Sequence, residues 1–278
     1  MPIATTSLSG GSTAVHYDTY GNPAAPTVVL IHGTGADARQ WLHLANHLKD
    51  RFHILALDLA GSGRTTGPEG SVALDDLASQ VRAVVHHAGI NSYHLLGHSL
   101  GAMVAASIAA ASPQRIASLV LHAGWVHADV EMTATFEQWR TLLATGGNAL
   151  LAEAIALQAF GPHYWAGVAD LDTHRRLVAQ MASTIAPGTD LLIGLDLAID
   201  LTTALSAITA PTLLLHSRHD RIVPKARRDA LSASLPHAHV VELDQGHAAP
   251  AIDPDGFAVE VSRFLATHAR PRHSIEHR

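Results

Sequence analysis

The chain has 278 residues, 47% of them hydrophobic, with a formal net charge of −6 and no cysteine. This length and composition predict a globular protein with one large domain, or one domain with an insertion. The negative charge argues against a nucleic-acid surface, which would need a basic face. The lack of cysteine excludes a thiol nucleophile, a disulfide scaffold and cysteine metal sites.

Apolar strands alternate with helical patterns through the first half of the chain. Continuous apolar runs such as 27–31 are typical of strands buried on both faces of a sheet. Apolar residues at helical spacing from Leu74 to Val85 end at Gly89, which suits a helix C′ position. The predicted strands are residues 13–17, 27–31, 52–57, 93–96 and 118–122, and the predicted helices are 41–48, 74–85 and 100–110.

The second half resumes this alternation after an interval of different character. Strands are predicted at 211–216 and 239–243, and helices at 225–235 and from Pro254 onward, with Asp253 as N-cap. The interval 126–205 contains helical patterns and no clear strand. We therefore predict a parallel α/β core, residues 1–125 and 206–268, with a helical cap, 126–205, over the carboxyl end of the sheet and a flexible tail, 269–278.

The Gly-His-Ser-Leu-Gly stretch at residues 97–101 lies between a predicted strand and a predicted helix. In that context G-x-S-x-G predicts a nucleophile elbow, a sharp turn that exposes Ser99. Gly97 and Gly101 are expected because a Cβ there would strike the adjoining strand or helix. The N–H of Leu100 is a candidate oxyanion donor. The simpler interpretation is a glycine-rich turn with a surface serine.

A serine hydroxyl needs a base, and the base needs an orienting group. Asp220 follows one predicted strand and His247 follows the last, so both are expected at the sheet edge that carries Ser99. The chain order Ser, Asp, His is the one expected for this architecture. Alternatively, Asp220 is a turn or N-cap carboxylate and His247 one of 21 scattered histidines. Asp129 is the other acid position considered.

These motifs resemble the α/β-hydrolase superfamily, and more narrowly its small cap-bearing esterases and lactonases of the enol-lactonase and haloperoxidase-like type. The resemblance extends over about 13–267. It implies an α/β-hydrolase fold with a mostly parallel, eight-stranded sheet, helices on both faces and a helical cap insertion. It depends on His32-Gly33-x-Gly35, Asp58-x-x-Gly61-x-Gly63, the Ser99 elbow, the Asp220 loop and Gly246-His247.

The resemblance also implies roles for individual residues. Thr34 would supply the second oxyanion N–H beside that of Leu100. Asp58, Arg64 and Asp200 would be structural. The expected substrate contacts are Gly33, His98 and Trp125. Of these, His98 is interpreted as a packed or supporting group rather than as the base. For Trp41, His127, Phe160 and Trp165, pocket lining and helix packing are equally compatible with the sequence.

The predicted function is that of a serine hydrolase which cleaves a carboxylic ester or lactone of a small, largely apolar molecule through an acyl-enzyme. No cofactor is expected, and the scattered histidines predict no metal site. Other functions remain open for the same triad: a C–C bond hydrolase, a cofactor-free perhydrolase, or a non-hydrolytic enzyme for cyclisation or decarboxylation. A small-molecule receptor on this fold is the remote alternative.

The N-terminal ten residues lack the pattern of a signal peptide, and no 18-residue apolar run is evident. We therefore expect a cytoplasmic protein without membrane or nucleic-acid partners. The sequence leaves a homodimer open.

Overall fold

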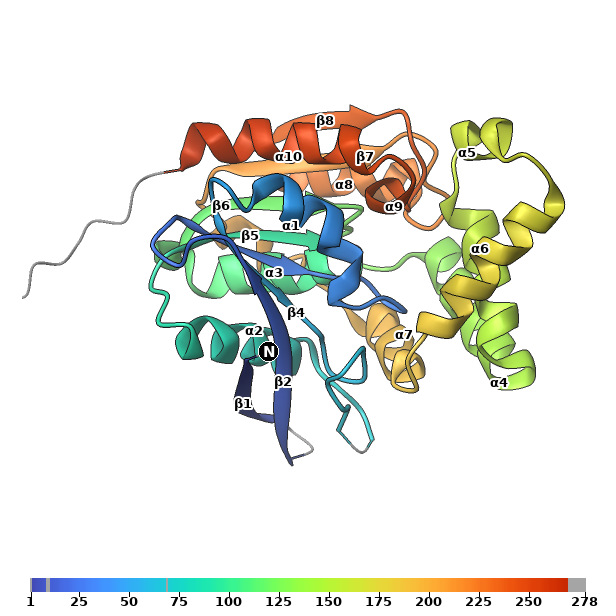
Figure 1. The fold of residues 1–278 in the computed structure, drawn as a ribbon, viewed down its shortest axis with the longest axis horizontal. Coiled ribbons are helices and arrows are strands. Elements are labelled where there is room, and N and C mark those ends of the chain that lie inside the picture. Colours follow the sequence, from blue (N-terminus) through green and yellow to red (C-terminus); the bar gives the residue numbers. More distant parts are fainter. Residues whose placement is uncertain (1, 9–10, 69, 270–278) are drawn as a thin grey trace, which may run out of the picture.

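The structure is a computed structural model, and it describes residues 2–8, 11–68 and 70–269. Its centre is an eight-stranded sheet of order β1-β2-β4-β3-β5-β6-β7-β8 (Figure 1). The pairs β1–β2 and β2–β4 are antiparallel and the others parallel, so the predicted mostly parallel sheet is confirmed. The strands are β1 (Ile3–Leu8), β2 (Gly11–Tyr20), β3 (Thr27–Ile31), β4 (His53–Leu57), β5 (Tyr93–His98), β6 (Ile116–His122), β7 (Thr212–Ser217) and β8 (His239–Leu243).

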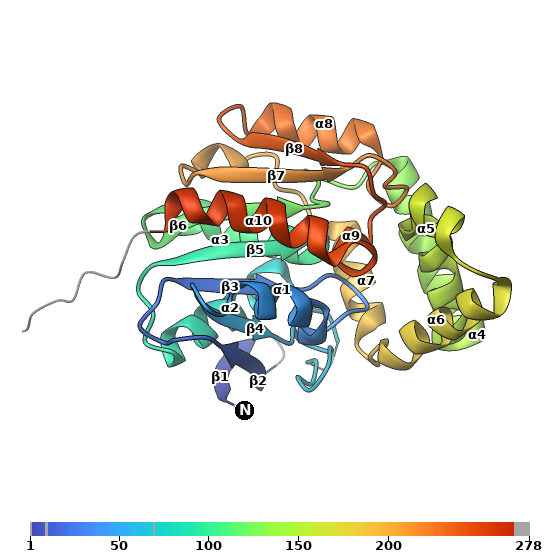
Figure 2. The ribbon, with the colours of Figure 1, turned by 45° about the horizontal axis from the view of Figure 1, so that its top comes forward.

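Two hydrophobic cores sandwich the sheet. In β3, Val29 and Ile31 enter the core beneath α2, α3 and α8, whereas Val28 and Leu30 enter the core beneath α1 and α10 (Figure 2). Strands buried on both faces need apolar side chains at every position, which explains their continuous apolar runs. The core helices are α1 (Leu42–Leu48), α2 (Leu74–His87), α3 (Leu100–Ala111), α8 (Lys225–Ser234), α9 (Ala249–Ile252) and α10 (Pro254–His268), with short 3-10 helices η1 (Ala38–Trp41), η2 (Pro113–Arg115) and η3 (Leu205–Ala207).

Four α-helices lie between β6 and β7 in the sequence. We call them the helical insertion: α4 (Val130–Ala159), α5 (Pro162–Gly167), α6 (Leu171–Thr184) and α7 (Thr189–Ala198). In Figures 1 and 2, α4, α5 and α6 form a group beyond one end of the sheet, and α7 lies between that group and the strands. They fall within the interval 126–205 that we expect to form a cap.

Several elements are not predicted from the sequence, among them β1, α5, α7 and the short helix α9. β1 alternates only weakly, since Ala4 and Leu8 alone are buried along it. α5 is a six-residue helix, and α7 is apolar on most sides. Weak or all-round patterns of this kind carry no clear period, so they do not reveal an element. The predicted flexible tail falls on Ala269 and on residues 270–278, and the latter lie outside the described residues.

By length and composition alone, α4 could cross a membrane, although no 18-residue apolar run is evident in the sequence. This is weak evidence for a span. Gly147 has φ 64° and ψ −161° and breaks the helix there. Phe136, Trp139 and Leu151 of α4 belong to the main hydrophobic core, so α4 packs as a helix of the fold.

Candidate active site

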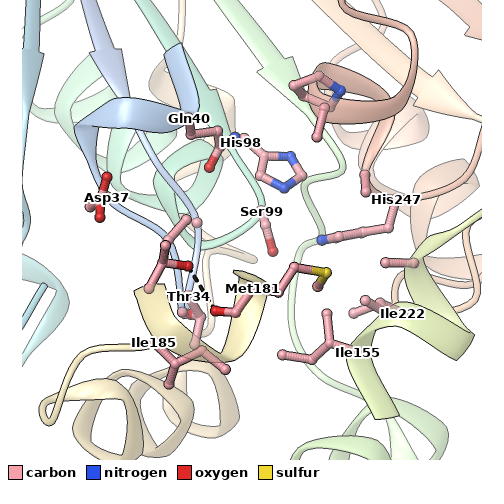
Figure 3. A pocket seen from close by; sticks show the side chains of 18 of the residues that line it. Thr34, Asp37, Gln40, His98, Ser99, Ile155, Met181, Ile185, Ile222 and His247 are labelled. Atoms are coloured by element: carbon pink, nitrogen blue, oxygen red, sulfur yellow. Dashed lines mark hydrogen bonds between the residues drawn. The ribbon is translucent and has the colours of Figure 1, made fainter. Parts of the chain in front are cut away.

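The predicted site residues lie at the carboxyl ends of parallel strands. In the sheet, β4 lies on one side of β3 and β5 lies on the other. The chain runs from β3 to β4 and then crosses over to β5, so the strand order reverses between β3 and β5, which makes this a topological switch point. Thr34 follows β3 and Ser99 follows β5, on either side of this point. Figure 3 shows Thr34, His98, Ser99 and His247 around one cavity.

Ser99 occupies a strained backbone conformation, with φ 54° and ψ −123°. A Cβ on Gly97 would lie 2.0 Å from the carbonyl oxygen of Gly101, and a Cβ on Gly101 would lie 2.2 Å from that of Ile31. Only glycine fits at either position, as the motif predicts. Leu100 is the first residue of α3, so its N–H has no partner within the helix and is available at the elbow.

Asp220 and His247 are joined by a hydrogen bond of 2.8 Å from imidazole Nδ1 to carboxylate Oδ2. The other oxygen, Oδ1, accepts from the N–H groups of Ile222 and Val223 at 2.9 and 2.8 Å. Burial raises the pKa of Asp220, but the attraction of His247 and these hydrogen bonds outweigh it and hold the pKa below its ordinary value. The carboxylate therefore stays ionised and orients the ring, leaving Nε2 for another partner.

The turn after β3 is anchored from below by His32. Its Nδ1 donates to the Gly33 carbonyl at 2.8 Å, and its Nε2 accepts from the N–H of Leu59 at 3.0 Å. Burial lowers the pKa of His32, so the ring is neutral and matches this pattern of one donor and one acceptor. In a trans peptide the carbonyl and the next N–H point in opposite directions. The N–H of Thr34 is therefore directed away from His32.

A row of buried histidines runs beside the site. His98 Nδ1 lies 2.8 Å from His122 Nδ1, and His122 Nε2 lies 3.0 Å from the Ser217 hydroxyl. Burial lowers the pKa of His98, and lowers that of His122 to about 3. Both rings are therefore neutral at pH 7. His98 lies between His122 and His247, with ring centroids 4.9 and 4.8 Å away, and supports the cavity wall.

The cavity has a volume of about 360 Å³. Its polar end is formed by the segment from Asp37 to Gln40, where the Arg39 guanidinium forms an ion pair with the Asp37 carboxylate. The opposite wall is apolar and comes mostly from the helical insertion. Its residues are Trp139, Ile155, Leu177, Met181 and Ile185, with Ile222 from the core.

Residues 26–254 match the family described as the alpha/beta hydrolase fold. The chain belongs to this family. It is 30% identical over 262 residues to "Putative carbamate hydrolase RutD" of Azorhizobium caulinodans, covering 92% of this chain and 95% of that protein. It is 31% identical over 249 residues to the pyrrolizixenacetamide deacetylase of Xenorhabdus hominickii, covering 88% and 93%.

Among solved structures, the enol-lactonase of Burkholderia xenovorans LB400 has a similar fold. Its TM-score is 0.83 at 23% sequence identity, and the match covers 94% of this chain and 99% of that one. The resemblance inferred from the motifs is therefore confirmed at the level of the family, and the protein is a hydrolase.

Not every residue predicted to contact the substrate lines the cavity of this hydrolase. Gly33 lines it, and a Cβ there would lie 3.0 Å from the Cβ of Ser99. Trp125, by contrast, is fully buried away from the cavity, against Phe136 of α4 and Met103 of α3. The expectation for Trp125 is wrong because the chain after β6 turns toward α4, which carries the indole into the core.

The remaining acidic candidates have local roles in the hydrolase. Asp58 accepts from the Ala38 N–H at 2.9 Å and from the Arg64 side chain at 2.8 Å, so it ties together the loops after β3 and β4. Asp129 caps α4 and pairs with Arg227 at 3.0 Å. Asp200 accepts from the N–H of Thr202 in an exposed turn.

The aromatic candidates of undecided role also lie outside the cavity wall. Trp41, the last residue of η1, packs on Phe257, and Phe160 packs on Tyr164. Trp165 donates to the Phe160 carbonyl, and His127 lies near Arg227.

Sequence reasoning missed the apolar wall of the cavity and Arg39. The spacing of Leu177 and Met181, one helical turn apart, is the signal that marks one apolar face on α6. That signal does not reveal which neighbour the face covers. Among the residues that the structure describes, no group of three or more His, Asp and Glu is arranged to hold a metal ion.

Proposed function

We propose that this hydrolase is a serine acyl hydrolase that cleaves a carboxylic ester or lactone of a small, largely apolar molecule. The observation that carries the proposal is the hydrogen bond between His247 and Asp220 at a cavity whose wall also contains the strained Ser99. These are the three groups that nucleophilic catalysis by serine requires.

In the proposed reaction, His247 Nε2 takes the proton of Ser99 as its Oγ attacks the substrate carbonyl carbon. The ionised Asp220 keeps Nδ1 protonated and balances the imidazolium. The N–H groups of Thr34 and Leu100 stabilise the oxyanion. The tetrahedral intermediate collapses, and His247 protonates the departing alkoxide. Water, deprotonated by His247, then attacks the acyl-enzyme and releases the acid and Ser99.

The character of the cavity supports a neutral, largely apolar substrate. Its apolar wall favours burial of a hydrocarbon acyl or alkyl group. At the polar end, Asp37 and Arg39 pair with each other, so neither presents an uncompensated charge to a ligand. Two arginines of the helical insertion are also paired and do not line the cavity: Arg140 pairs with Asp190, and Arg175 with Asp172.

A second candidate is cleavage of a C–N acyl bond. It is favoured by two relatives at 30% and 31% identity, one named as a putative carbamate hydrolase and the other as an acetamide deacetylase. The triad chemistry is the same, but the leaving amine must be protonated as it departs. Esters and amides with the same acyl group therefore separate the two candidates.

The test is a panel of matched esters, lactones and amides, assayed with the wild type and with Ser99→Ala. We expect Ser99→Ala to lower kcat by the order of 10⁶, because the triad acts as a unit. Ser206→Ala, at an exposed serine, is the control and should be unchanged. A loss below tenfold in Ser99→Ala would rule out the serine mechanism. Faster turnover of the amides than of the matched esters would favour the second candidate.

A further inference from the structure

Asp196 is a buried carboxyl group outside the proposed triad. It lies on α7 of the helical insertion and is 1% exposed. Its Oδ2 lies 2.7 Å from the side-chain hydroxyl of Thr34, on the turn after β3. Its other oxygen, Oδ1, is buried and has no hydrogen-bond partner among the described residues. An ionised carboxylate in such a place would be poorly compensated.

The charged groups of the surrounding elements are paired elsewhere. On α7 itself, Asp190 pairs with Arg140 of α4, and on the turn after β3, Asp37 pairs with Arg39. In the loop after β4, Arg64 pairs with Asp18 and Asp58. His32, beneath the turn, is neutral and bonds to Gly33. No cation among the described residues therefore compensates Asp196, and burial raises its pKa to about 8. At pH 7 the group carries a proton.

Thr34 is consequently held from two sides. The core anchors the preceding carbonyl through His32, and the insertion holds the hydroxyl through Asp196. Helix α7, which carries Asp196, also contacts the core at its N-terminal end. There the N–H of Gly188 donates to the Gly61 carbonyl at 3.2 Å. A Cβ on Gly188 would lie 2.3 Å from the Cα of Gly61, so the two backbones are in close contact. The Asp196–Thr34 bond is thus a direct link between the insertion and the turn of the proposed oxyanion hole.

We propose that Asp196 is a positioning residue that, as a neutral acid, holds Thr34 and thereby fixes the oxyanion turn against the helical insertion. This inference rests on the proposed function, because Thr34 is assigned there as an oxyanion donor. The Thr34 hydroxyl donates to the Asp196 carboxyl and so lowers its pKa, but burial outweighs that bond. Loss of the proton would put a charge in a buried site that no described cation compensates, so the insertion should move to let water reach the carboxylate, and this link would loosen. Oxyanion stabilisation should then weaken, which lowers kcat more than it raises KM.

The first test compares pH–rate profiles of the wild type, Asp196→Asn and Asp190→Asn. The asparagine at 196 keeps the shape of the neutral acid and cannot ionise. We expect kcat of the wild type to fall above about pH 8, and kcat of Asp196→Asn to stay level there while remaining within about threefold of wild type at pH 7. Asp190→Asn, on the same helix at a half-exposed pair, should keep the alkaline fall. An equal alkaline fall in Asp196→Asn would overturn the inference.

A second pair of variants addresses the hydroxyl of Thr34 directly. Thr34→Val keeps the size of the side chain and removes the bond to Asp196, whereas Thr34→Ser keeps the hydroxyl. We expect Thr34→Val to lower kcat about tenfold with little change in KM, and Thr34→Ser to restore most of it. Equal kcat values for the two variants would contradict a positioning role.

Thermal unfolding tests the proton on Asp196 without relying on activity. A carboxyl whose pKa is raised in the folded state binds more protons when folded, so its contribution to stability is full below about pH 4 and is lost as pH rises toward 8. The Tm of Asp196→Asn minus the Tm of the wild type should therefore be larger at pH 8 than at pH 4 by about 2–4 °C or more. A pH-independent difference in Tm would overturn the inference. If the proposed function were wrong, Ser99→Ala would keep its activity while the pH-dependent increase in the Tm of Asp196→Asn would still be observed.

Discussion

The elbow at the sheet edge and the wall formed by the helical insertion meet at the same cavity, and they are built in different ways. At the elbow, backbone approaches backbone so closely that Gly97 and Gly101 leave no room for a methyl group. In the insertion, α6 and α7 present side chains to their neighbours, and a Cβ on Gly194 of α7 would meet nothing within 4 Å. The elbow beside the cavity is therefore fixed by backbone contacts, whereas the apolar wall of the cavity is formed by side chains.

After Ser99→Ala, the largest loss of kcat is expected for a change at Asp220, which lies in the α/β core. Asp220→Asn keeps the size of the side chain but removes the charge that selects the Nδ1–H tautomer of His247. We expect kcat to fall by about 10⁴ with a similar KM. Steady-state kinetics with the preferred ester would measure this. Asp129→Asn, at an acid that caps α4, is the control and should retain activity.

Replacing a glycine by alanine should change the free energy of unfolding in opposite directions in the two regions. Gly97→Ala places a Cβ against the Gly101 carbonyl and should lower the free energy of unfolding by about 1–3 kcal/mol or more. Gly194→Ala replaces a helical glycine in open space and should raise it by about 0.5–1 kcal/mol. Denaturant titrations of both variants give the comparison. If Gly97→Ala were as stable as the wild type, the close packing of the elbow would be refuted.

The smallest effect is expected in the insertion wall. Leu177 and Ala251 line both the cavity and a neighbouring groove beside α5, so together they separate the two spaces. Leu177→Ala should open this wall and raise kcat/KM for long acyl chains relative to short ones by about tenfold. Leu171→Ala, at an exposed leucine on the same helix, is the control. An unchanged chain-length profile in Leu177→Ala would mean that this wall does not limit the substrate.

The sequence by itself determined the features that local sterics and burial dictate. Continuous apolar runs marked β3, β4, β5 and β7, because strands buried on both faces allow few polar residues. The glycines around Ser99 marked a turn that a Cβ would block. Strand ends also placed Asp220 and His247 at one sheet edge, since parallel strands share their direction. These inferences need only the period of the pattern and the geometry of the chain.

The tertiary structure alone decided which buried surfaces face each other. Trp125, an expected substrate contact, is buried in the core, whereas Met181, for which the sequence predicted no role, lines the cavity. Thr34 and Asp196 are 162 positions apart and share one hydrogen bond. Periodicity shows that a side chain is buried but not what it is buried against, because that depends on how separate elements pack. The contacts of the insertion with the turn after β3 are therefore visible only in the folded chain.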